Sequence, residues 1–186
     1  MANWQRSALR RPAGRNGSDE RVVVVDDLEE VRQSFRPRRI ATLFVAESPP
    51  YKGTFFYSEN SRLYFRVKKV FGNSSKFLSE FKSRGFYLDD LVLYPINQFK
   101  EKRERQEHRW NGVPLLAERI KSYRPAAVVV LMYAIEPMVD EAMKQAGLGS
   151  VPRHVTPFPT YPRNLKTFNE KMGEILPKLP VNGRPL

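Results

Sequence analysis

The sequence predicts an α/β fold: a three-layer α/β/α sandwich built on a central, mainly parallel four-stranded sheet. Four short apolar runs recur along the chain, and polar or turn residues followed by a helical pattern come after each of them. The length of 186 residues suits one domain with tails. The expected strands are Ile40–Ala46, Phe86–Tyr94, Ala126–Tyr133 and, from a weaker pattern, Arg153–Phe158.

Start and stop signals place the helices between these strands. Ser75 is an expected cap, Pro114 suits a first helical turn, and Gly85, Gly147 and Pro177 are expected to end helices. The run Val22–Val25 is either a fifth strand at the sheet edge or part of the helix packing. The expected helices are Asp27–Phe35, Ser61–Phe71, Ser75–Arg84, Pro114–Tyr123, Glu136–Ala146 and Leu165–Leu176.

Composition divides the chain into an arm, a domain and a tail. Residues 1–21 carry arginines among Gly, Ser, Asn and Pro, which predicts a flexible basic arm. Residues 22–176 form the expected domain, and the prolines of residues 177–186 predict a loose tail. The chain has 32 Lys and Arg against 20 Asp and Glu, a formal charge of +12, which favours a polyanionic partner such as DNA.

The sequence lacks the residues that several kinds of catalytic and metal site require. With no cysteine there is no disulfide, thiolate cluster, cysteine zinc site or cysteine nucleophile, and two histidines argue against a transition-metal site. Phosphate-cradling glycine motifs and a serine nucleophile elbow are missing. No apolar run approaches the ~20 residues that cross a bilayer. We therefore expect a soluble, cytoplasmic, monomeric protein with no cofactor and no metal.

Ligands of open parallel sheets bind beyond the carboxyl ends of the strands, and Glu47 stands there. A strand that ends in a carboxylate and enters the rigid Pro49–Pro50 loop can hold that carboxylate for water activation or for stabilising a cation. Alternatively, Glu47 caps a helix or pairs with an arginine. The aromatic run at residues 55–57 is either core or a stacking platform. Asp89 and Asp90 alternate across the next strand, so we expect them not to share one site.

A charge-dense run, Lys100–Arg109, follows the second expected strand. Its mixed signs are typical of a solvated helix or flap. The alternative is a mobile loop that grips phosphate, because arginine can clamp phosphate with two hydrogen bonds. The candidate phosphate ligands are Arg103, Arg105, Arg109 and, after the last strand, Arg163.

The order of these segments resembles the uracil-DNA glycosylase superfamily over roughly Arg39 to Leu176. Ala46-Glu47-Ser48-Pro49-Pro50 is similar to a Gly-Glu-Ala-Pro-Gly first motif, and Thr156-Pro157-Phe158-Pro159-Thr160 resembles the second motif, commonly His-Pro-Ser. The strand Phe86–Val92 resembles the one that ends in a base-reading Asn, and Pro125–Leu131 resembles the third strand. The resemblance implies a DNA repair hydrolase of the uracil-DNA glycosylase-like fold.

In this resemblance Glu47 handles the attacking water, Phe56 stacks on a flipped base, and Asp90, Phe158 and Ser48 line the base pocket. Three departures stand out: Phe158 replaces the usual His, Asp90 replaces Asn, and the cluster cysteines of the most similar branch are missing. The implied activity is hydrolysis of the N-glycosidic bond of uracil or another deaminated base in DNA. The alternative is a weak or inactive member that binds nucleic acid or a nucleobase.

Overall fold

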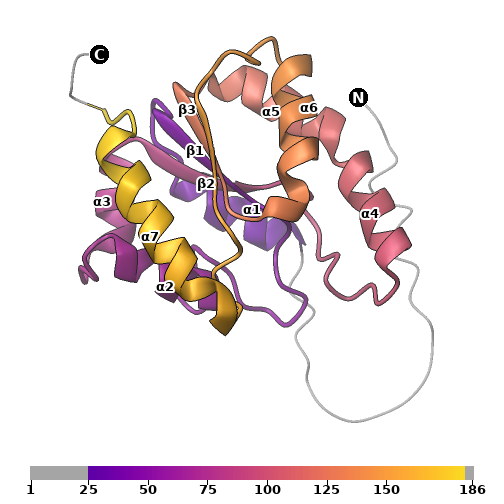
Figure 1. The fold of residues 1–186 in the computed structure, drawn as a ribbon, viewed down its shortest axis with the longest axis horizontal. Coiled ribbons are helices and arrows are strands. Elements are labelled where there is room, and N and C mark those ends of the chain that lie inside the picture. The colour runs from indigo at the N-terminus through magenta and orange to yellow at the C-terminus, as the bar shows by residue number, and fades with distance from the viewer. Residues whose placement is uncertain (1–24, 183–186) are drawn as a thin grey trace.

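The computed structural model describes residues 25–182, and its architecture confirms the α/β expectation (Figure 1). The four strands form one all-parallel sheet in the order β2-β1-β3-β4. In Figure 1, α2, α3 and α7 lie on one side of the sheet and α5 and α6 lie on the other, so the sandwich has three layers. The strands are β1 (Thr42–Ala46), β2 (Phe86–Asp90), β3 (Ala127–Val130) and β4 (Arg153–Val155).

Every expected helix is present, with small shifts at its ends, and the charge-dense run is helical as well. The α-helices are α1 (Val25–Ser34), α2 (Arg62–Val70), α3 (Phe77–Ser83), α4 (Lys102–Asn111), α5 (Val113–Tyr123), α6 (Glu136–Gln145) and α7 (Leu165–Ile175). The short 3-10 turns are η2 (Tyr133–Ile135), η3 (Pro162–Asn164) and η4 (Leu176–Lys178).

Several local expectations are corrected. The cap of α3 was expected at Ser75, but Lys76 precedes the helix without a side-chain cap, because Ser74 takes the local bonds instead, accepting from the Lys76 amide at 3.1 Å. Val25 begins α1 and is no strand residue, whereas Val22–Val24 and the expected arm at residues 1–21 lie outside the described residues. β1 ends at Ala46 as expected, but β2, β3 and β4 end three or four residues before their apolar runs do, since buried loop residues such as Leu91 extend those runs past the sheet.

The segment after α7 is packed against the domain as far as Asn182, contrary to the expected loose tail. Thr42 Oγ1 donates to the Pro180 carbonyl at 2.9 Å, and the Asn182 amide donates to the Arg84 carbonyl at 2.9 Å. Leu179 is buried. Apolar burial and these bonds outweigh the local effect of the prolines, so the domain reaches at least to residue 182.

The core is built on the buried strands, and one side of it is dominated by aromatic rings. Phe44 of β1 and Phe86 of β2 contact each other and rings from α3 and the end of α2. Because hydrogen-bonded strands with both faces covered are rigid, the carboxyl edge of this sheet is a firm platform for side chains.

Candidate functional site at the carboxyl edge of the sheet

Glu47 lies directly beyond the end of β1, where the backbone still pairs with the segment that follows β2. The Val92 amide donates to the Glu47 carbonyl at 3.0 Å, and Ala46 stands opposite Asp90 in the sheet register. The Glu47 residue is only 7% exposed. The expectation that a carboxylate is held at this edge is therefore met by its geometry.

Two arginines of α4 bind the carboxylate of Glu47. Arg109 donates from Nε to Oε1 at 2.7 Å and from Nη2 to the same oxygen, while Arg105 donates from Nε to Oε1 at 3.0 Å and from Nη2 to Oε2. Arg109 is buried, whereas the Arg105 side chain keeps 27% of its surface exposed. The pairing alternative for Glu47 is confirmed, and in this state neither guanidinium is free for phosphate.

A second ion cluster lies at the end of β2. Arg32 of α1 donates from Nη2 to Asp90 Oδ2 at 2.6 Å and lies 3.6 Å from Asp89 Oδ1, so both carboxylates share one cation. The expectation that they would not share a site is wrong, because Asp89 turns back to accept the Asp90 amide at 2.8 Å and the forked guanidinium reaches both. Arg119 of α5 completes the cluster, donating to Asp89 Oδ2 at 2.8 Å.

Burial changes the acidity of this cluster. Loss of hydration raises the pKa of Asp90 to about 6; the Arg32 charge opposes that rise and the Asp89 charge adds to it. Asp90 therefore takes up a proton at mildly acidic pH. A protonated carboxyl can donate a hydrogen bond, which the ionised form cannot.

The remaining base-binding candidates are placed differently. Phe56 is 3% exposed and packs against Tyr64, Phe77 and Phe81, so its ring belongs to the core.

Ser48 accepts the Ile96 amide at 3.4 Å, which ties the segment after β1 to the segment after β2. Phe158 is half-buried beside Tyr161, and Asn164 Nδ2 donates to its carbonyl at 2.9 Å. The structure thus brings together Glu47, Arg105 and Arg109, but it does not bring Phe56 to an open site.

Two candidate phosphate ligands are accessible. The Arg103 side chain is 93% exposed and pairs with Glu107 one turn along α4. Arg163 is exposed, with its guanidinium 5.8 Å from the centre of the Tyr161 ring. A shallow hollow on α4 is lined by side chains that include Lys102, Arg103 and Trp110. Exposed cations beside aromatic rings are the elements of a nucleic-acid contact surface.

Sequence reasoning missed the long-range partners of the two carboxylate clusters. Arg32 and Arg119 occupy ordinary helical positions, and nothing in the local pattern signals that either meets Asp89. It also missed Asn97, whose Oδ1 accepts the Tyr51 amide at 3.0 Å. That bond could not be read from the sequence because 46 residues separate its partners.

No protein-family model and no curated protein matches this chain. Within residues 25–182, no three His, Cys, Asp or Glu side chains gather as a metal ion would need. The helices in that part of the chain are all too short or too polar to cross a membrane.

Proposed function

We propose that this protein binds DNA at the carboxyl edge of its sheet and hydrolyses the N-glycosidic bond of an extruded, deaminated base, in the manner of a DNA glycosylase. The observation that carries the proposal is the position of Glu47, a carboxylate fixed at the end of β1 with arginines from α4 around it. The motif resemblance around Glu47 supports the same activity, whereas Phe158 and Asp90, which depart from the motifs, favour the alternative below.

The chemistry assigns one step to the Glu47 carboxylate. The base leaves with the electron pair of its bond to C1′, and the sugar becomes an oxocarbenium-like cation. Water then bonds to C1′ while Glu47 accepts its proton and its negative charge faces the cation. The proton passes through solvent to the departed base, so the products are an abasic sugar and a free base.

At least one of the two arginines must leave Glu47 for this step. Two guanidinium charges against one carboxylate leave the cluster with a net positive charge, which opposes a cationic sugar. DNA phosphates compete for arginine, and Arg105 is the accessible member of the pair. We propose that phosphate binding draws Arg105 off Glu47 and frees the carboxylate for water.

A second candidate function is DNA binding without hydrolysis. The same double ion pair favours it, since the two arginines occupy the carboxylate oxygens that would hold the attacking water, and the burial of Phe56 removes the expected base-stacking ring. Both candidates share one surface and differ in whether an abasic product forms.

The test is a low-salt screen with single- and double-stranded oligonucleotides that contain uracil, a G·T mismatch, hypoxanthine, xanthine or ethenocytosine. Abasic sites are read by alkaline cleavage, and binding is read separately by fluorescence anisotropy. Wild-type protein is compared with Glu47→Gln and with the control Glu107→Gln, which alters an exposed carboxylate on α4 that pairs with Arg103.

We expect abasic product from wild-type protein and from Glu107→Gln, but not from Glu47→Gln. Binding without product from any oligonucleotide would select the second candidate. Neither binding nor product would overturn both.

A further inference from the structure

The eight tyrosines of the chain divide into two groups of four. Four are buried in the core: Tyr57, Tyr64, Tyr87 and Tyr123. The other four are exposed, and each lies on the segment that follows a different strand: Tyr51 after β1 (59%), Tyr94 after β2 (40%), Tyr133 after β3 (46%) and Tyr161 after β4 (45%). Since all four strands are parallel, these segments leave the sheet at the same edge. We call these four residues the tyrosine rim.

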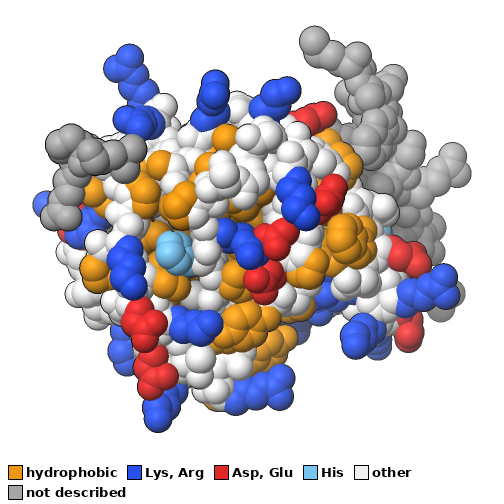
Figure 2. Space-filling model, turned by 45° about the horizontal axis from the view of Figure 1, so that its top comes forward, with side chains coloured by type: hydrophobic (Ala, Val, Ile, Leu, Met, Phe, Trp, Pro, Cys, Tyr) orange, Lys and Arg blue, Asp and Glu red, His pale blue; other side chains and the backbone are white. Residues whose placement is uncertain are grey.

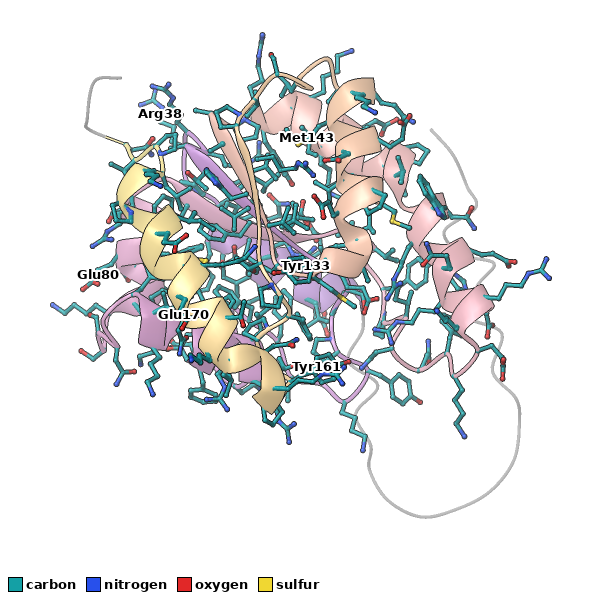
Figure 3. All side chains as sticks on the ribbon, in the orientation of Figure 1. Arg38, Glu80, Tyr133, Met143, Tyr161 and Glu170 are labelled. Carbon is teal, nitrogen blue, oxygen red and sulfur yellow. The ribbon has the colours of Figure 1, made fainter. Side chains whose placement is uncertain are left out.

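A hydrogen bond joins two of the segments that carry the rim, and the other two lie beside α7. The Tyr51 amide is bound by Asn97, so the first and second segments touch. On the other half of the sheet, Lys171 of α7 lies 5.3 Å from the centre of the Tyr133 ring, and Tyr161 immediately precedes η3 and α7. Figure 3 shows Tyr133 and Tyr161 both beside α7. The rim therefore follows the edge of the sheet from β2 to β4.

Cations accompany the rings. Arg163 lies over Tyr161, Lys171 lies over Tyr133, and Lys52 is exposed next to Tyr51 in sequence. On the face seen in Figure 2, blue Lys and Arg side chains are scattered, with red acidic side chains between some of them. A row of accessible rings with adjoining cations fits a chain of alternating flat bases and phosphates.

The strand form follows from the geometry of bases. In a duplex each base face is covered by its neighbours in the stack, so a protein ring at the surface finds only base edges and backbone. An unpaired strand offers its base faces to aromatic side chains. We propose that the tyrosine rim is a stacking surface for single-stranded DNA. This deepens the proposed function and rests on it, because it assigns the strand form that the carboxyl edge binds.

The experiment measures binding of the full-length protein to fluorescent oligonucleotides of about 12 nucleotides, within the usual span of such surfaces. The probes are oligothymidylate, a duplex of mixed sequence, and a strand of equal length whose internal sugars lack bases. The variants are Tyr51→Ala and Tyr161→Ala, the conservative Tyr51→Phe and Tyr161→Phe, and Lys144→Ala. Lys144 is an exposed cation beside Met143, which Figure 3 places at the far end of α6 from Tyr161.

Oligothymidylate should bind more tightly than the duplex or the base-free strand. Each alanine variant should weaken its binding about five-fold or more, as expected from the loss of one stacked base. The phenylalanine variants and Lys144→Ala should bind like wild type. Equal affinity for the strand with bases and the strand without them would overturn the proposal, even if every alanine variant failed to fold.

The two proposals fail separately. Stacking-dependent binding without any abasic product leaves the tyrosine rim standing and removes the hydrolase. Abasic product from a protein that binds duplex as tightly as single strand, with no loss in the alanine variants, removes the rim and leaves the hydrolase.

Discussion

Arg109 Nε lies 2.7 Å from Glu47 Oε1, a hydrogen bond that joins two residues 62 positions apart. Both side chains are almost completely buried, and Gln106 accepts a further Arg109 proton at 2.9 Å. The bond fastens α4 to the end of β1. Whatever moves α4 therefore alters the surroundings of the one carboxylate at the end of that strand.

The first prediction concerns stability. Glu47→Gln leaves two guanidinium groups, one of them buried, without their carboxylate, so the free energy of unfolding should fall by about 2 to 4 kcal/mol. Urea unfolding followed by circular dichroism measures it. The exposed pair partner Glu107 provides the control, since Glu107→Gln should change the value by less than about 1 kcal/mol. Equal effects of the two substitutions would show that the buried ion pair contributes no stability.

The raised pKa of Asp90 predicts that the free energy of unfolding depends on pH. Its pKa is raised from 3.8 to about 6 by burial, so the folded state binds a proton more tightly than the unfolded state. The contribution of Asp90 to stability is therefore greatest below about pH 4 and falls as the pH rises towards 6. Urea unfolding of wild type and Asp90→Asn across this range should show that the variant loses this downward component. Glu174→Gln, which alters an exposed carboxyl on α7, should retain it. A variant whose slope matches wild type would contradict the shifted pKa.

The phosphate contacts can be tested by salt dependence. If Arg103 and Arg163 bind DNA phosphates, each alanine substitution should lower affinity and reduce the slope of log affinity against log salt by about one. Fluorescence anisotropy between low and physiological salt measures both quantities. Lys144→Ala should leave the slope unchanged. An affinity that does not vary with salt in wild type would contradict phosphate contacts altogether.

Two glycines test the packing of the C-terminal segment. Gly85 and Gly72 both have positive φ, so alanine strains the backbone at either position, by about 1 kcal/mol. At Gly85 a Cβ would also lie within 2.5 to 2.7 Å of Asn182 side-chain atoms, whereas at Gly72 it would meet nothing within 4 Å. Gly85→Ala should therefore lower the melting temperature more than Gly72→Ala. Adding Asn182→Ala should remove part of the difference, and equal melting temperatures would show that Asn182 is not held there.

The sheet could be predicted from the sequence because its information is local. Apolar runs of strand length, each followed by a helical pattern, predicted the four strands of the sheet, and the end of the first run placed Glu47 at the carboxyl edge. Ser61 likewise caps α2 at the start of its expected helix.

The site could be predicted only in part because its contacts are distant in sequence. The mixed signs of Lys100–Arg109 predicted a solvated helix or flap, and the segment is helical, but they could not reveal that Arg105 and Arg109 turn inward to Glu47. The sequence made Phe56 a candidate stacking ring, but in the structure it is enclosed by rings of α2 and α3. The sequence does contain a tyrosine after each strand, but this pattern can be recognised only once the ends of the strands and the exposure of the side chains are known.

The most direct test of the central claim is the single-turnover rate of base release, measured on the oligonucleotide that reacts fastest in the screen. We predict that Glu47→Gln, once circular dichroism has shown that it is folded, releases the base at least about 100-fold more slowly than wild type, as expected for the loss of a general base. Glu47→Asp, which keeps the charge, should retain more activity than Glu47→Gln. An unchanged rate in folded Glu47→Gln, or no base release by wild type from any oligonucleotide, would contradict the account.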